Sequence, residues 1–121
     1  MGRFDGGDIL ERSSRFSAEA VRFVRQLPRD DVSRHIGLQF VRAATSVGAN
    51  LCEADMADGV RDFCHKVNIA QKESAEAGYW LQLMADSGLR DGREVEGLLA
   101  EIRQLGRICR QIILSTRRRL E

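Results

Sequence analysis

The chain has 121 residues, 43% of them hydrophobic and 31% charged, as in one globular domain and unlike a disordered segment. Its 19 basic and 18 acidic residues nearly cancel, which excludes a chain that is basic or acidic throughout. A single proline and only 6% aromatic residues favour helices over a β-sandwich.

The first predicted helix covers residues 8–27, after a stretch 1–7 that we expect to be frayed. Apolar and small side chains recur along it every three or four residues, a spacing that places them on one helix face. These residues are Ile9, Ser13, Phe16, Ala20, Phe23 and Leu27. Pro28 ends the helix, because proline disfavours helical geometry in the residue before it.

The second predicted helix covers residues 31–54 and is rich in small residues. Its stripe consists of Ile36, Phe40, Ala43, Val47, Asn50 and Ala54. Gly37 and Gly48 lie inside it, and each costs about 1 kcal/mol relative to alanine. Either another helix approaches the glycines closely or tertiary packing tolerates a weak helix, and we favour the close approach.

The third and fourth predicted helices cover residues 58–86 and 92–119. Asp58 can cap the third helix, and Asp91 with Glu94 can cap the fourth. The stripe of the third helix is Val60, Phe63, Val67, Ala70, Ser74, Ala77, Leu81 and Met84. The stripe of the fourth is Val95, Leu98, Ile102, Leu105, Cys109, Ile112 and Thr116.

Four amphipathic segments joined by short turns predict an all-α fold, an antiparallel up-down-up-down four-helix bundle that forms a single domain over residues 8–121. Some apolar residues lie off the stripes. They are Val21, Val24, Tyr79, Trp80, Leu99 and Ile113. They are either scattered surface residues or part of a second apolar surface for self-association, and the pattern leaves both open.

A polar line on the second helix can meet charged residues of the third. The candidates are Arg42, Asn50, Glu53, Lys66, Glu73 and Glu76. Such carboxylates could serve metal or acid–base chemistry, or ion pairs between them could fix the helix register. A di-metal bundle site requires two Glu-x-x-His elements, and the sequence contains none. We therefore predict a structural polar network, without a metal and without a cofactor.

The sequence offers no recognisable catalytic set. Cys64 directly precedes His65, so on a helix the two side chains point about 100° apart and cannot form a nucleophile–base pair. Phosphate-binding loops, dinucleotide-binding turns and nucleophile elbows are absent. Cys52, Cys64 and Cys109 form no C-x-x-C pair, which argues against disulfides and a zinc site. We therefore expect no catalytic residues and no enzyme.

Arginines gather on the fourth helix. They are Arg103, Arg107, Arg110, Arg117, Arg118 and Arg119. Cations near a helix C-terminus offset the helix dipole, which is the structural interpretation. The alternative is a phosphate-binding patch that contacts nucleic acid, and repetition of the patch in an oligomer would strengthen its potential.

No run of 18 apolar residues occurs, so we expect no membrane span and no membrane partner. The first residues include no hydrophobic signal segment. Together these features predict a cytoplasmic protein.

Two motifs resemble the signatures of a known family. The first is the run RAATSVGANLCEA, residues 42–54. The second consists of Asp62-Phe63, Lys66, residues 69–74, Glu76 and residues 79–81. Over roughly residues 16–119, the chain is similar to the bacterial four-helix-bundle family, also called the 23S rRNA-intervening sequence protein family.

This resemblance implies a four-helix bundle that assembles as a homopentamer around a central channel and has no enzymatic activity. A related protein, the accessory variability determinant of diversity-generating retroelements, binds a reverse transcriptase and contacts nucleic acid through a basic surface. Two functions follow. The first is a non-enzymatic oligomeric interaction protein of uncharacterised role. The second is a nucleic-acid-binding accessory protein that acts with a reverse transcriptase, although the near-neutral charge departs from that strongly basic relative.

Overall fold

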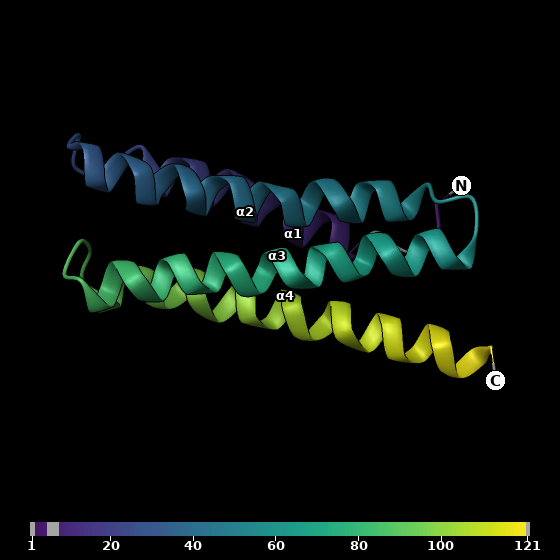
Figure 1. Cartoon of the computed structure of the whole chain (residues 1–121). Helices are drawn as coiled ribbons and strands as arrows, with labels where there is room; N and C mark the ends of the chain where they lie inside the picture. Colours follow the sequence, from purple (N-terminus) through teal and green to yellow (C-terminus); the bar gives the residue numbers. More distant parts are fainter. Residues whose placement is uncertain (1, 5–7, 121) are drawn as a thin grey trace.

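Four antiparallel α-helices form the computed structural model, which describes residues 2–4 and 8–120 (Figure 1). The helices are α1 Asp8–Val24, α2 Asp31–Asp55, α3 Val60–Asp86 and α4 Gly92–Arg119. No strand occurs within these two described ranges. The predicted all-α four-helix bundle is confirmed.

The four helices pair unevenly. Long contacts join α2 to α3 and α3 to α4, whereas α1 packs mainly on α2 and meets α4 along a short seam (Figure 1). The helices also differ in length: α1 has 17 residues and α4 has 28. At about 1.5 Å per residue, α4 is longer than α1 by about 16 Å. One stretch of α4 therefore lacks a helix on its α1 side.

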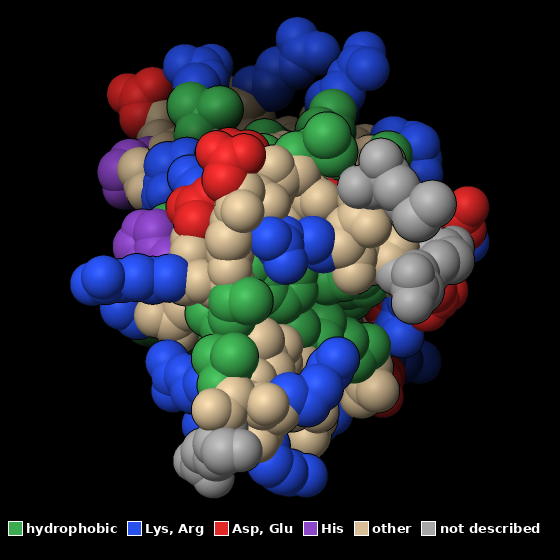
Figure 2. All heavy atoms as spheres, turned by 90° about the vertical axis from the view of Figure 1, so that its right-hand side faces the viewer, with side chains coloured by type: hydrophobic (Ala, Val, Ile, Leu, Met, Phe, Trp, Pro, Cys, Tyr) green, Lys and Arg blue, Asp and Glu red, His purple; other side chains and the backbone are tan. Residues whose placement is uncertain are grey.

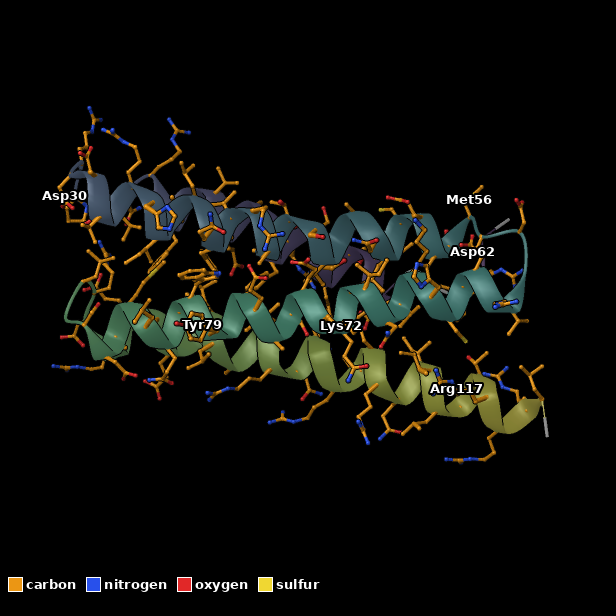
Figure 3. The ribbon with its side chains drawn as sticks, viewed as in Figure 1. Asp30, Met56, Asp62, Lys72, Tyr79 and Arg117 are labelled. Carbon is orange, nitrogen blue, oxygen red and sulfur yellow. The ribbon has the colours of Figure 1, made fainter. Side chains whose placement is uncertain are left out.

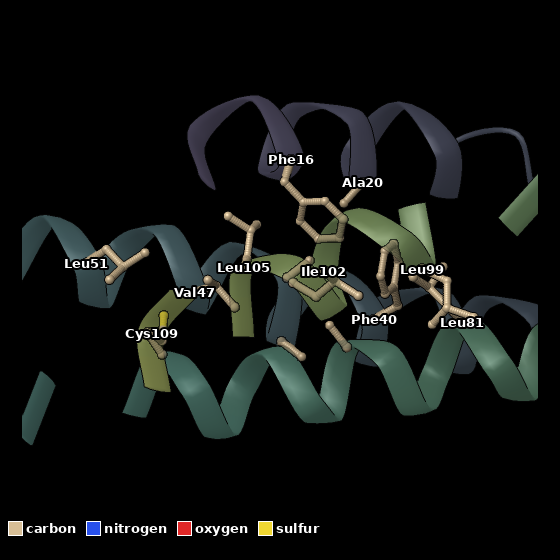
Figure 4. Packing of buried hydrophobic residues seen from close by; sticks show 14 of the residues in the cluster. Phe16, Ala20, Phe40, Val47, Leu51, Leu81, Leu99, Ile102, Leu105 and Cys109 are labelled. Atoms are coloured by element: carbon tan, nitrogen blue, oxygen red, sulfur yellow. The ribbon is translucent and has the colours of Figure 1, made fainter. Parts of the chain in front are cut away.

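The core lies along the axis of the bundle and is filled from all four helices. Phe16 of α1 and Phe40 of α2 make an edge-to-face contact with ring centroids 6.2 Å apart, and Phe23 contacts Phe40 at the same separation. Figure 4 shows Phe16 pointing from α1 toward the other helices. The largest fully buried apolar side chains are Phe16, Phe40, Leu51, Leu81, Met84, Ile102 and Leu105.

Helix ends differ from the predicted ones at three places. α1 ends at Val24 and not at residue 27, because the next amides of Gln26 and Leu27 bond to carbonyls three residues back. Leu27 nevertheless stays buried. α2 extends one residue further than predicted, to Asp55. α3 begins at Val60 after the N-cap residue Gly59, so Asp58 is not its cap.

Residues 2–4 lie against the turn between α2 and α3. The amide of Arg3 donates to the Asp55 carbonyl at 3.0 Å, and that of Phe4 to Asp55 Oδ1 at 2.8 Å. The Phe4 ring lies 5.3 Å from that of Phe63. These three residues are held in place, in contrast to the predicted frayed end, and residues 1 and 5–7 of that stretch lie outside the described residues.

Both glycines of α2 adjoin α1 or the turn that follows it. A methyl group on Gly48 would lie 3.3 Å from Ser17 Oγ and 3.5 Å from the Ser13 carbonyl oxygen. A methyl group on Gly37 would lie 2.9 Å from a Val24 methyl. The small residues thus allow close approach, the interpretation we favoured from sequence.

Candidate nucleic-acid interface

The polar line of α2 faces α3 and forms ion pairs with it. Arg42 Nη1 lies 3.4 Å from Glu73 Oε2, and Arg42 Nη2 pairs with Glu76. Further along, Lys66 Nζ lies 2.8 Å from Glu53 Oε1. The structure therefore brings five of the six candidate residues together in pairs across the two helices.

Asn50, the sixth candidate, bonds within its own helix. Its Nδ2 donates to the Ser46 carbonyl at 2.9 Å and to Ser46 Oγ at 3.0 Å. These bonds run along α2 and leave α3 untouched. Sequence spacing could not distinguish this local bond from a bond between helices, because the residue lies on the same polar line.

One carboxylate of these ion pairs, that of Glu76, is stabilised as an anion by its neighbours. The Trp80 indole N–H donates to Glu76 Oε2 at 3.1 Å, and this bond, with the Arg42 guanidinium, lowers the pKa of Glu76. The hydrogen bond from Lys66 to Glu53 raises the pKa of Lys66. Throughout the described part of the chain, no three His, Cys, Asp or Glu side chains are grouped so that they could hold a metal ion.

A second polar feature is a groove between α3 and α4, on the outside of the bundle. Two adjoining hollows of about 490 and 430 Å³ form it, and they share Gln71, Ala75 and Arg110. We call it the basic groove, because five cations line it. They are Lys72, Arg103, Arg107, Arg110 and Arg117.

The floor of the basic groove is made of small residues. Gly78 of α3 and Gly106 of α4 carry no side chain, and Ala75 and the buried Ser74 lie beside them. Larger residues at these positions would fill the space between the helices. Tyr79 lines the same hollow and is 59% exposed (Figure 3).

The charged side chains that line the basic groove are all positive among the described residues. Among the residues that the structure describes, no Asp or Glu lines the two hollows. Across residues 2–4 and 8–120, none of its five cations forms an ion pair with a carboxylate. Arg107 Nη1 donates instead to Gln104 Oε1 at 3.3 Å. The guanidinium groups are therefore available to an anionic ligand.

The structure divides the six predicted arginines. Arg103, Arg107, Arg110 and Arg117 line the basic groove, whereas Arg119 lines a different hollow at the end of the bundle. Arg118 is exposed and lines neither.

Two groove residues, Lys72 and Tyr79, were missed by sequence reasoning. Both lie on α3, seven residues apart, and Figure 3 labels them with Arg117 of α4. The spacing of seven was visible in the sequence as a shared helix face. The sequence could not show that this face of α3 is turned toward the groove with α4, because that depends on the rotation of α3 relative to α4.

The groove has the dimensions and chemistry of a site for a phosphodiester chain. From Arg103 to Arg117, α4 rises about 21 Å, a length that corresponds to about six phosphates of one strand. Guanidinium groups bind phosphate oxygens in a bidentate way, and an exposed tyrosine ring can stack on a base.

Within the described residues, no helix is long and apolar enough to cross a membrane. Burial raises the pKa of the Cys109 thiol to about 11, which disfavours a reactive thiolate there.

The comparisons with known proteins agree with the fold. No protein of curated function matches the sequence closely. A crystal structure of a protein of unknown function from the S23 ribosomal protein family of Bacteroides thetaiotaomicron is similar, with a TM-score of 0.82 and 28% identity. The match covers 87% of this chain and 97% of that one. The family model described as 23S rRNA-intervening sequence protein matches residues 7–111, and the chain therefore belongs to that family, as the resemblance predicted.

Proposed function

We propose that this chain is a non-enzymatic, cytoplasmic interaction protein that binds the sugar–phosphate backbone of RNA through the basic groove. The observation that carries the proposal is the set of five cations that line one groove together with no carboxylate. Their charges are not offset by ion pairs within the described residues, so a polyanion would supply the missing counter-charge.

The near-zero net charge is compatible with this proposal. The acidic side chains of the described residues lie elsewhere, and some of them pair with cations there, as Glu73 and Glu76 do with Arg42. The balance of charge in the whole chain therefore conceals a local excess at one surface. Contacts to the backbone predict weak dependence on base sequence and strong dependence on salt.

The same pairing supports a non-enzymatic role. Glu53, Glu73 and Glu76 lie at the surface between α2 and α3, each beside a cation, and none of them lines the hollows described above. A catalytic carboxylate needs access to a substrate in a cleft. We therefore assign these residues to the stability of the α2–α3 pair.

Binding of a fluorescent 20-nucleotide single-stranded RNA, followed by anisotropy across a salt series, tests the proposal. Five phosphate contacts predict a slope of log K against log salt of about −3.5. Replacing Arg103, Arg110 and Arg117 together by Gln should weaken binding at least tenfold at low salt. The slope should fall to about −1.4, because three contacts are removed.

The matched control is a triple change of Arg22, Arg25 and Arg29 to Gln, which removes the same charge at exposed positions outside the groove. This control should change the affinity less than twofold. Equal losses in both triple variants, or binding that does not respond to salt, would contradict the proposal.

Self-association into a pentamer is a second proposal, and exposed apolar side chains favour it. Val32 and Leu38 on α2 are 68% and 60% exposed. Of the off-stripe residues, Leu99 and Ile113 are buried in the core, whereas Val21 and Tyr79 are exposed. An oligomer would cover side chains such as Val21, Val32 and Leu38, which lie outside the basic groove, and would repeat that groove once per subunit.

A further inference from the structure

A third hollow lies at the end of the bundle that carries both chain ends. It has a volume of about 650 Å³ and lies between the first turn of α1, the start of α3 and the C-terminal part of α4. We call it the end groove. Figure 2 shows this end of the molecule, where apolar side chains form a central strip bordered by Lys and Arg.

The floor of the end groove is apolar. Ile108 and Ile112 lie one turn apart on α4 and are only partly buried, and Phe63 of α3 and Phe4 lie beside them. Ile9, at the start of α1, closes the groove at one end. The arrangement is a short apolar strip along one side of a helix.

The groove exists because α1 is short. Arg12 of α1 pairs with Glu101 of α4 at 2.7 Å, and Asp8 lies beside Gln104 at the edge of the groove. Beyond Gln104, α4 continues for 15 residues, about 22 Å, to Arg119. Among the described residues no helix covers this side of α4, so a partner helix could pack along Ile108 and Ile112 there.

The rim of the end groove is basic. Arg3, Arg107 and Arg119 line it, against the single carboxylate of Asp8. The Arg3 guanidinium lies 5.9 Å from the centre of the Phe63 ring and donates to the Ala57 carbonyl at 2.9 Å. An occupant that complements this rim carries carboxylates on both sides of an apolar face.

We propose that the end groove binds an acidic amphipathic helix of a partner protein, which packs against the C-terminal part of α4 next to the start of α1. Such a helix of about 14 residues would place apolar side chains at i, i+3 or i+4, and i+7 against Ile108, Ile112 and Phe63. Its Asp and Glu side chains would pair with Arg3, Arg107 and Arg119. This site is additional to the RNA-binding function, because the two grooves share only Arg107 and the apolar floor of the end groove belongs to neither hollow of the basic groove.

A display library of helical 14-residue peptides, selected against the full chain, tests the proposal without assuming a sequence. Selected peptides should carry Leu, Ile or Phe at the stated spacing, with Asp or Glu on the flanks. The best peptide, labelled with a fluorophore, should bind at least tenfold more weakly to Ile112→Glu and to Arg119→Glu. Circular dichroism checks that both variants keep their helix content.

The chain offers a control for each variant. Leu114→Glu makes the same change on another side of α4, and Arg118→Glu reverses a charge next to Arg119 but outside the groove. Both should bind the peptide as the parent does. RNA binding should be unchanged in Ile112→Glu, so failure of this proposal can be distinguished from failure of the RNA proposal.

Three results would overturn the proposal. One is selection of peptides without acidic flanks, or of none. Another is equal loss of binding in Ile112→Glu and Leu114→Glu. The third is an oligomer of this chain that Ile112→Glu dissociates, because the groove would then belong to a second copy.

Discussion

At the scale of single residues, Gly48 is the position where the backbone of α1 limits the size of a side chain on α2. The nearest atoms to a methyl group at this position include the carbonyl of Ser13, which cannot rotate away as a side chain can. Displacing the Ser13 backbone would also move Phe16, which is fully buried. A branched side chain at Gly48 would therefore separate α1 from α2.

Gly48→Ile should destabilise the protein by about 1–3 kcal/mol, the range for overpacked cores. Urea unfolding followed by circular dichroism measures it. The control is Gly97→Ala, because Gly97 lies on an open surface of α4. That change should stabilise by about 1 kcal/mol through helix propensity. If Gly48→Ile left stability unchanged, the close approach would be refuted.

The contacts of Glu76 predict that the stability of the protein falls at acidic pH. Its hydrogen bond from Trp80 and its pairing with Arg42 lower its pKa in the folded state. A depressed carboxyl pKa adds stability above the ordinary pKa, and this stability is lost as the pH falls through the folded value. The loss should begin near pH 4.5 and grow toward lower pH.

Thermal unfolding of the parent and of Glu76→Gln at a series of pH values measures this dependence. Glu76→Gln should be less stable at neutral pH and should lose less stability on acidification. Glu96→Gln, an exposed change on α4, should keep the acid dependence of the parent. Parallel curves for Glu76→Gln and the parent would show that the pairing contributes nothing.

At the scale of helices, the turns at one end of the bundle are joined by Arg90. Its guanidinium lies 5.2 Å from the centre of the Phe23 ring, and Nη1 donates to the Gln26 carbonyl at 3.3 Å. It also pairs with Glu94 of α4. One side chain therefore links the α3–α4 turn to the end of α1.

Arg90→Ala should lower the free energy of unfolding by about 1–2 kcal/mol, because a cation–π contact and hydrogen bonds are lost together. Arg90→Lys should recover only part of this loss, since an ammonium group lacks the planar fork. Arg93→Ala serves as the control, because that side chain is 91% exposed. Chemical denaturation distinguishes the three, and equal stability of Arg90→Ala and Arg93→Ala would refute the link.

Helix number, helix order and five of the eight helix ends could be predicted from the sequence, whereas three helix ends could not. The stripes of α3 and α4 alternate in steps of three and four, which only a helix explains. Leu27 continues the stripe of α1 and is buried, yet it lies in the turn after the helix. The spacing of hydrophobic residues shows which side chains are buried. It does not show where a helix ends, because a turn that packs on the core also contains buried side chains.

At the scale of the whole molecule, the candidate site was only partly visible in the sequence. Clustering of arginines on α4 identified four of the five groove cations. Lys72 joins them because α3 presents this residue to the same groove, which depends on helix rotation. The hollow itself depends on two glycines from different helices, Gly78 of α3 and Gly106 of α4, which both line it. Contacts of this kind are set by tertiary packing and are not encoded in local spacing.

The pentamer is also a prediction at this scale. Light scattering after size exclusion, at tens of micromolar chain, should give the mass of five subunits of 13.6 kDa each. Exposed apolar side chains such as Leu38 provide the driving force. A monomer across the concentration range would contradict self-association, and a dimer or tetramer would correct the subunit number.

The short seam between α1 and α4 has a consequence for the route by which the chain folds. All long helix contacts join segments that follow one another, so each can form by closing a short loop. Among the pairs of helices that touch, the one pair that is distant in the chain, α1 with α4, has the smallest contact. The chain therefore loses little loop-closure entropy before its native contacts form. We expect the isolated chain to fold within microseconds to milliseconds.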